Sequence, residues 1–178
     1  MLILLILIVL IVAADQLTKW LAVVYLKSGE VAEVIPGVLH FKYLENDGAA
    51  FGMLDNARWV FMVLSTVAIV ALLVFLWRFP PKSLLCRVSV VFLIGGGIGN
   101  MIDRCLLGYV VDFIDFCAFP EIWRYVFNVA DAFVTVGTGM LMFYLIREMI
   151  RDAKKERLGC KCGAGGDANG DGDDGREN

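Results

Sequence analysis

Long stretches of this 178-residue chain contain no charged residue. Asp, Glu, Lys and Arg are absent from residues 1–14, 59–77, 88–102 and 132–146, and 59 % of the chain is hydrophobic, with a mean hydropathy of +0.72. This composition excludes a soluble globular domain and is typical of an integral membrane protein. The net charge of −3 averages charge-free runs with short charged stretches. We therefore expect membrane lipids, and no nucleic acid, as partners.

Histidine is nearly absent as well, because His40 is the single one. The sequence has no His-Glu-x-x-His motif and no segment that clusters Cys with His, so a zinc peptidase lacks its ligands. The four serines have no neighbouring His or Lys pattern and no Gly-x-Ser-x-Gly segment, which argues against serine catalysis. The five cysteines imply no disulfide framework, and the Cys160-x-Cys162 pair is an incomplete metal site. We expect no metal and no cofactor.

The apolar runs predict four transmembrane helices. The first run is not preceded by basic residues and continues past Asp15, which argues against a cleaved signal peptide. Between the first two runs, a segment rich in Val, Ile, Phe and Tyr is broken at Pro36-Gly37 and predicts two short strands outside the bilayer. The predicted spans are residues 1–26, 57–77, 86–103 and 127–147, with the strand region at 28–56. They form one domain, 1–158, followed by a Gly- and Asp-rich tail, 159–178, that we expect to be disordered.

Basic residues predict the orientation of the chain. Arg78, Lys82 and Arg87 occupy one short connection, and further Lys and Arg residues follow Arg147. By the positive-inside rule these segments are cytosolic, which places both termini inside and the connections 27–57 and 103–130 outside.

Counting residues from the cytosolic side predicts that several carboxylates lie at one depth. Asp15 follows 14 uncharged residues, Asp103 follows 15, and Asp131 precedes 15. At 1.5 Å per residue, all three lie about 21–23 Å above the inner boundary. Because lipid is unfavourable for ions, these carboxylates should face each other, and Asp112 in the outer connection can fold down to join them.

Asp112 and Asp131 form the candidate acid/base pair. No cation adjoins either residue in sequence, so burial and mutual repulsion can set their protonation. Asp115 competes with Asp112, and spacing alone does not choose between them, although Lys42 or Arg124 could hold Asp115 in an ion pair. Two further pairs, Asp15 with Lys19 and Asp103 with Arg104, are adequately explained as charge pairs that lock helix packing.

Five motifs in this order resemble the bacterial lipoprotein signal peptidase family, signal peptidase II, over roughly residues 1–150. They are DQLTK (15–19), NDGAAFG (46–52), GNMIDR (99–104), VVDF (110–113) and FNVAD (127–131). The resemblance implies a monomeric aspartic endopeptidase of the bacterial cytoplasmic (inner) membrane. Its implied substrates are prolipoproteins, cleaved before a diacylglyceryl-modified cysteine near the outer leaflet.

The resemblance also assigns residues. The family's catalytic pair falls on Asp112 and Asp131, in preference to Asp115. The implied fold is an all-α membrane protein, a four-transmembrane-helix bundle with a small extracytoplasmic β-cradle and a short lid helix near residues 120–125. The supporting positions implied by the resemblance are Asp15, Lys19, Asn46, Gly48, Asn100, Asp103, Arg104, Asn128 and Ala130.

Two other functions remain compatible with the residues taken alone. Buried carboxylates can relay protons in a transporter or channel, although the chain shows no internal repeat of the kind common in transporters. A noncatalytic assembly protein could instead pack through the small-residue face of Gly95 and Gly99.

Overall fold

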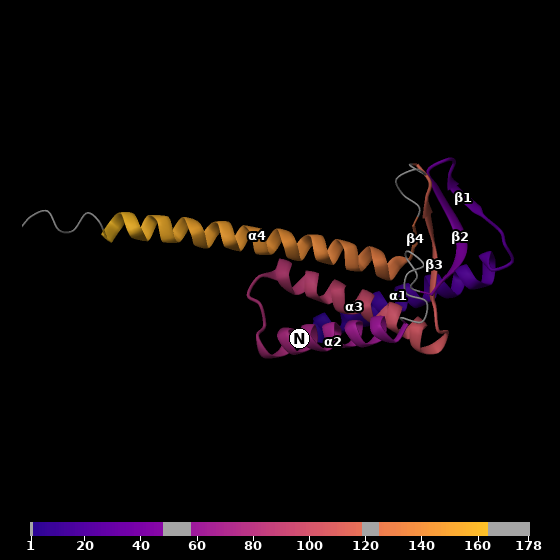
Figure 1. The fold of residues 1–178 in the computed structure, drawn as a ribbon, viewed down its shortest axis with the longest axis horizontal. Helices are drawn as coiled ribbons and strands as arrows, with labels where there is room; N and C mark the ends of the chain where they lie inside the picture. Colours follow the sequence, from indigo (N-terminus) through magenta and orange to yellow (C-terminus); the bar gives the residue numbers. More distant parts are fainter. Residues whose placement is uncertain (1, 48–57, 119–124, 164–178) are drawn as a thin grey trace, which may run out of the picture. The chain divides into compact units, whose positions relative to one another are not determined.

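A computed structural model describes residues 2–47, 58–118 and 125–163 (Figure 1). The chain divides into two compact units, residues 1–141 and 142–178. The first unit contains three helices, a four-stranded sheet and the start of a fourth helix, and the second contains the remainder of that helix. In chain order the helices are α1 (Leu2–Leu26), α2 (Arg58–Arg78), α3 (Leu84–Leu106) and α4 (Val129–Gly163).

Three of these helices are long and apolar enough to cross a membrane. Among the described residues they are Leu2–Leu26, Leu84–Leu106 and Val129–Lys155, while the apolar part of α2, Met62–Arg78, is shorter. Many large apolar side chains on α1 and α2 point away from the protein, as Leu2 and Trp77 do. Such exposure is unfavourable in water and is expected for a surface that faces lipid.

Helix α3 packs closely against α1 and α4, because glycines line the two faces that contact them. A methyl group added to Gly95 would lie 2.8 Å from Ile11 Cγ2, and one added to Gly99 would lie 2.5 Å from Asp15 Oδ2, both on α1. A methyl group on Gly96 would lie 2.5 Å from the backbone oxygen of Ala130, on α4. Gly95 and Gly99, the small-residue face noted in the sequence, therefore pack against α1 within the chain, and Gly96 lets α4 approach α3.

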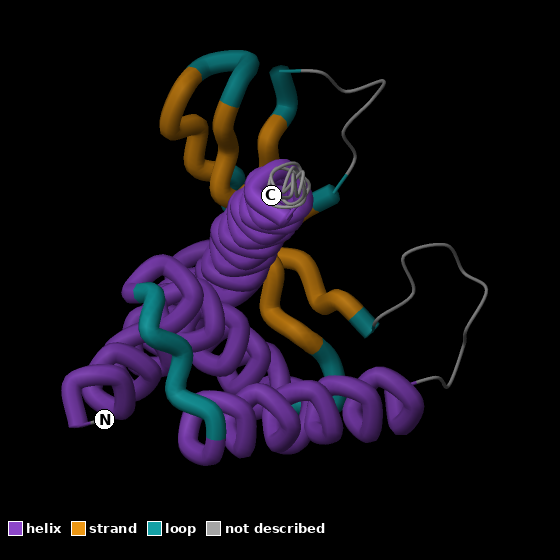
Figure 2. The backbone as a smooth tube through the Cα atoms, turned by 90° about the vertical axis from the view of Figure 1, so that its left-hand side faces the viewer, coloured by secondary structure: helices purple, strands orange, loops and turns teal. Residues whose placement is uncertain are grey.

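The sheet is larger than the predicted hairpin. Strands β1 (Ala32–Ile35) and β2 (Leu39–Asn46) pair antiparallel across a turn in which Gly37 has a φ of 69°, which confirms the hairpin. Strands β3 (Val110–Phe116) and β4 (Val126–Phe127) extend it in the order β1-β2-β3-β4, all antiparallel (Figure 1). Figure 2 draws the strands in orange and the helices in purple. The predicted fold, four helices with a small β-cradle, is thus confirmed in part: the protein is mostly helical, and its sheet has four antiparallel strands rather than a single hairpin.

Strand β3 is the element that the sequence analysis missed. Its β-branched and aromatic residues favour a strand, but the pairing that stabilises it is with β2, some 70 residues earlier in the chain. Val111 and Phe113 of β3 pack on Ala22 and Leu26 of α1, forming a small core between sheet and helix.

Two further predictions concern segments that lie partly outside the described residues. The tail was expected from residue 159, but α4 continues to Gly163, and residues 164–178 lie outside the described residues. The predicted lid helix near 120–125 also falls almost wholly outside them, as does Gly48.

Candidate active site

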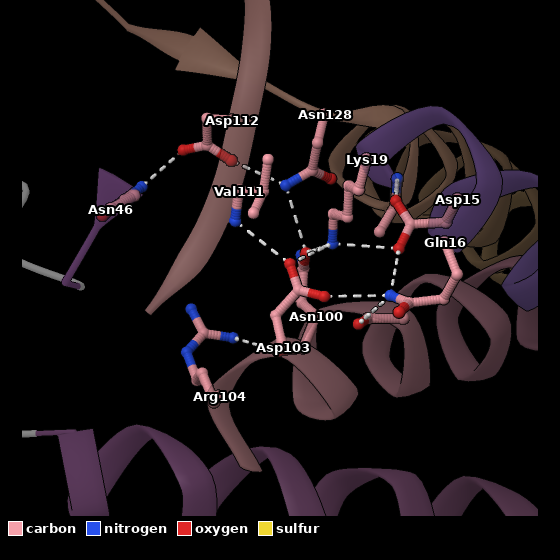
Figure 3. Close-up of polar contacts among 12 residues, drawn as sticks. Asp15, Gln16, Lys19, Asn46, Asn100, Asp103, Arg104, Val111, Asp112 and Asn128 are labelled. Carbon is pink, nitrogen blue, oxygen red and sulfur yellow. Dashed lines mark hydrogen bonds and ion pairs between the residues drawn. The ribbon is translucent and has the colours of Figure 1, made fainter. Parts of the chain in front are cut away.

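A buried ion-pair network joins α1 to α3. Lys19 Nζ lies 2.9 Å from Asp15 Oδ2 and 3.0 Å from Asp103 Oδ2, and all three side chains are at most 3 % exposed (Figure 3). The predicted pair of Asp15 with Lys19 is confirmed. The predicted pair of Asp103 with Arg104 is wrong, because Asp103 points across to Lys19 while Arg104 Nη1 donates to the Asn100 backbone oxygen at 3.4 Å.

Gln16 completes this network, although the sequence analysis gave it no role. Its Nε2 donates to Asp103 Oδ1 at 3.0 Å, to the Gly99 backbone oxygen at 3.1 Å and to Asp15 Oδ2 at 3.2 Å. Its place inside the DQLTK motif was the available signal. Glycine at position 99 lets the two helices approach closely enough for these bonds.

The same two carboxylates position the elements that carry the candidate catalytic pair. Asp15 Oδ1 accepts the Ala130 backbone N–H at 2.8 Å, at the start of α4, where backbone amides have no partner within the helix. Asp103 Oδ2 accepts the Val111 backbone N–H at 3.0 Å, one residue before Asp112. Asp15 and Asp103 therefore anchor the backbones next to Asp131 and Asp112.

Asp112 is held by two amides. Asn46 Nδ2 donates to its Oδ2 and Asn128 Nδ2 donates to its Oδ1, each at 2.7 Å, and Asp112 is only 1 % exposed (Figure 3). Asn46 is the last residue of β2, and Asn128 immediately precedes α4.

Asp131 takes part in a reciprocal cap at the start of α4. Asn128 Oδ1 accepts the Asp131 backbone N–H at 2.9 Å, and Asp131 Oδ2 accepts the Asn128 backbone N–H at 3.3 Å. This is the capping-box arrangement, in which the residue before a helix and the third residue of the helix satisfy each other's amides. Asp131 Oδ1 is left to accept Asn100 Nδ2, at 2.7 Å.

Two asparagines connect the carboxylates into one hydrogen-bonded network. Asn128 Nδ2 donates to Asn100 Oδ1 at 3.1 Å as well as to Asp112, and Asn100 Oδ1 also accepts from Lys19 Nζ at 2.8 Å. Four carboxylates thus meet around one lysine, a formal charge of −4 + 1 = −3 if all were ionised. Since Asp15 and Asp103 contact the lysine directly, Asp112 and Asp131 are the pair with neutral amide partners.

Burial changes the protonation of Asp112. The loss of water raises the pKa of its carboxyl to about 6, and the nearby charge of Asp131 acts in the same direction, although the hydrogen bonds from Asn46 and Asn128 oppose the shift. A carboxyl with this pKa can exchange a proton near neutral pH.

The free energy of unfolding should depend on pH, because Asp112 titrates. The folded-state pKa of Asp112 lies above its unfolded value of 3.8, so folding is favoured most below about pH 4 and is weakened as pH rises from about 4 to 6. We expect the free energy of unfolding of the wild type to fall by up to about 3 kcal/mol relative to Asp112→Asn over this range, measured as thermal unfolding in detergent against pH. A difference that is independent of pH would contradict the burial of an ionisable Asp112.

Asp115→Asn is the matched control, because the pKa of Asp115 moves in the opposite direction. Partial burial opposes ionisation of Asp115, but Lys42 Nζ, 2.6 Å away, outweighs it and holds the pKa below the usual range. Asp115 therefore stabilises the fold above about pH 4 and loses this effect as pH falls. The ion pair with Lys42 is one of the two that the sequence analysis considered.

The structure brings together every predicted supporting residue that it describes. Arg104 makes its described contact to the backbone oxygen of Asn100 rather than to a carboxylate, and Gly48 is not described. Ala130 is fully buried and contributes its backbone N–H.

The fold and the site define a multi-pass membrane protein with several carboxylates buried in a polar centre between its helices and its sheet. The sequence model of Signal peptidase (SPase) II matches residues 7–147. The lipoprotein signal peptidase of Brevibacillus brevis is 40 % identical over 149 residues, covering 83 % of this chain and 94 % of the relative. That of Caldanaerobacter subterraneus subsp. tengcongensis is 45 % identical over 136 residues, covering 76 % and 90 %.

Solved structures agree with these relatives. A bacterial membrane enzyme determined by the in meso method at 2.3 Å resolution superposes with a TM-score of 0.74 at 33 % identity, covering 82 % of this chain and 88 % of the other. A second, at 1.9 Å resolution, gives a TM-score of 0.73 at 34 % identity. The chain belongs to the lipoprotein signal peptidase family, the signal peptidase II family of aspartic peptidases (family A8).

Proposed function

We propose that this protein is an intramembrane endopeptidase that removes signal peptides from prolipoproteins by cleaving before the diacylglyceryl-modified cysteine, with Asp112 and Asp131 as the catalytic residues. The observation that carries the proposal is the single hydrogen-bonded network in which Asn128 donates to Asp112, Asn100 donates to Asp131, and the two asparagines bond to each other. The lipoprotein signal peptidases that match this chain supply the substrate class.

The chemistry needs one proton shared by two carboxyl groups. Ionisation of two neighbouring buried carboxyl groups is energetically unfavourable, so one of them keeps its proton. The ionised partner takes a proton from water as the water attacks the scissile carbonyl, and the protonated partner donates to the carbonyl oxygen. When the tetrahedral intermediate collapses, the carboxyl that took the proton from water gives it to the leaving nitrogen. The other carboxylate takes back the proton of the hydroxyl group as the carbonyl re-forms, so the pair again holds one proton. The pair would titrate as a unit, and its apparent pKa values would belong to both residues.

The surrounding residues hold the pair for this reaction. Lys19 pairs with both Asp15 and Asp103, and those two carboxylates act as anchors for the backbones of Ala130 and Val111 rather than as acids. Asn46, Asn100 and Asn128 orient the reactive carboxylates without supplying a charge that would fix either in the ionised state. Arg104 and Gly48 complete the supporting set that we propose.

An apolar pocket suits the lipid-modified part of the substrate. Its volume is about 410 Å³, and it lies between α1 and the sheet. Phe113 of β3 and Val129 of α4 line it. Because side chains alternate along a strand, the pocket lies on the face of β3 opposite to Asp112.

We further propose that all four helices, α2 included, span the bacterial cytoplasmic membrane with both termini inside. The basic connection between α2 and α3 and the basic residues after Arg147 then lie in the cytosol, which leaves the sheet and the catalytic pair toward the outer leaflet. This orientation is the one that a substrate anchored in the outer leaflet by its diacylglyceryl group requires.

A cleavage assay tests the proposed specificity. The purified protein in detergent is given two peptides of one prolipoprotein sequence, with and without the diacylglyceryl group on the cysteine, and the products are identified by mass spectrometry. We expect cleavage immediately before the modified cysteine and at least about 100-fold slower cleavage of the unmodified peptide, because binding energy from the lipid is spent on orienting the scissile bond. Equal cleavage of both peptides, or proton-coupled transport without cleavage, would contradict the proposal.

A further inference from the structure

Three side chains that can bind a metal converge on the two central strands of the sheet, away from the carboxylate network. His40 on β2 lies opposite Asp115 on β3, and Cys117 follows two residues after Asp115. Residues two apart on an extended chain share a face, so all three side chains lie together. One ligand atom from each lies within 4.8 Å of the other two.

We propose that His40, Asp115 and Cys117 form a binding site for a divalent metal ion of the zinc type. Imidazole nitrogen, thiolate sulfur and carboxylate oxygen are the ligands that zinc takes from proteins. The proposal is independent of the peptidase chemistry. The cluster does not show in the sequence, because Asp115 and Cys117 lie about 75 residues after His40. Pairing of β2 with β3 brings the three residues together.

The geometry of the histidine and cysteine fits a tetrahedral ion. Cys117 Sγ lies 3.5 Å from His40 Nδ1. A zinc ion bonded to sulfur at about 2.3 Å and to nitrogen at about 2.0 Å holds those two atoms about 3.5 Å apart when the angle is tetrahedral. The backbone is also fixed at this point, because the Cys117 N–H donates to the Val38 backbone oxygen at 2.8 Å and so continues the β2–β3 pairing.

The second ring nitrogen of His40, Nε2, lies near the carboxylate of Glu33. His40 Nε2 is buried and has no hydrogen-bond partner among the described residues, which is uncommon for a buried polar atom. Glu33 Oε1, opposite His40 in the β1–β2 register, lies 4.0 Å away. A metal-bound histidine usually donates its second N–H to a carboxylate, and a small rotation of the exposed Glu33 side chain would supply that bond.

Lys42 competes with the metal for Asp115. Its ammonium lies 2.6 Å from Asp115 Oδ2, and its side chain is 40 % exposed. On binding, the lysine moves into solvent, Asp115 turns to the metal, and the Cys117 thiol releases its proton as the sulfur–metal bond forms. The metal thus replaces the lysine as the positive charge of this cluster.

The test uses Co²⁺ as a spectroscopic probe and Zn²⁺ as its competitor. Full-length protein carrying Cys160→Ser and Cys162→Ser, which removes the tail thiols, is stripped of metal in detergent and titrated with Co²⁺. We expect one Co²⁺ per chain with a thiolate-to-metal charge-transfer absorption that Zn²⁺ abolishes. Cys117→Ser should remove this absorption and His40→Ala should weaken binding at least about 100-fold, while the exposed Cys105→Ser should leave both unchanged.

A gain-of-affinity variant keeps the test independent of folding defects. Lys42→Met removes the competing cation and should tighten Co²⁺ binding by up to about fivefold, the range expected for a partly exposed ion pair. A charge-transfer signal that survives Cys117→Ser, an affinity unaffected by His40→Ala, or Lys42→Met protein that binds no more tightly would overturn the proposal.

Discussion

Asp112→Asn and Asp131→Asn are each expected to reduce cleavage of the lipid-modified peptide by about 10²- to 10⁴-fold, with the protein still folded. An amide has almost the shape of a carboxyl group but neither gives nor takes a proton, so each variant removes one half of the acid/base pair. Single-turnover cleavage followed by mass spectrometry measures the loss directly.

The two variants should differ in stability, which separates catalysis from helix capping. Asp131 accepts the Asn128 backbone N–H and Asn100 Nδ2 through different oxygens, and asparagine has only one such oxygen. We expect Asp131→Asn to cost about 1 kcal/mol of stability, the usual value of a helix cap, whereas its loss of activity is far larger than that cost explains. Asp152→Asn, an exposed position on α4 that pairs with Lys155, is the matched control and should retain full activity. Cleavage at the wild-type rate by either active-site variant would refute the assignment.

Lys19→Met is expected to destabilise the protein by about 3–5 kcal/mol. The lysine is the cation that contacts both Asp15 and Asp103, and its removal leaves two buried carboxylates without a counter-charge. Loss of those carboxylates as ions would also release the backbones of Ala130 and Val111 that they hold. Denaturant or thermal unfolding in detergent measures the effect, with secondary structure followed by circular dichroism.

Lys27→Met provides the comparison for this variant. Lys27 also pairs with a carboxylate, Glu45, but both side chains are about half exposed and lie 3.3 Å apart, so its loss should cost less than about 1 kcal/mol. The triple variant Asp15→Asn, Lys19→Met, Asp103→Asn should recover much of the stability lost in Lys19→Met, since no buried charge then remains unpaired. Equal destabilisation by Lys19→Met and Lys27→Met would mean that the network is not buried as described.

Local patterns explain why much of the architecture was predictable. An uncharged apolar run forms a helix in a membrane because its backbone must satisfy its own hydrogen bonds, so the runs in 1–14, 88–102 and 132–146 led directly to α1, α3 and α4. Gly95 and Gly99 predicted close helix contact because their missing side chains permit it, and the contact with α1 occurs at those residues. Pro36-Gly37 likewise marked the turn between β1 and β2.

The partner of each charged or polar side chain was harder to predict, because it depends on distances across the fold. Asp103 is adjacent to Arg104 in sequence yet pairs with Lys19, 84 residues earlier. Gln16 had no sequence feature beyond its motif, but it lies where α1 and α3 meet and bonds to both. His40 and Cys117 are 77 residues apart and become neighbours only because β2 pairs with β3.

By itself, the sequence determined the membrane class, the helix-forming runs, the hairpin and, through its motifs, the family, since each depends on residues close together in the chain. Only the tertiary structure decided the four-stranded sheet, the ion pairs of Lys19, the cap that joins Asp131 to Asn128 and the two amides that link it to Asp112. The physical reason is that ion pairs and hydrogen bonds act over about 3 Å in space, whatever the separation along the chain.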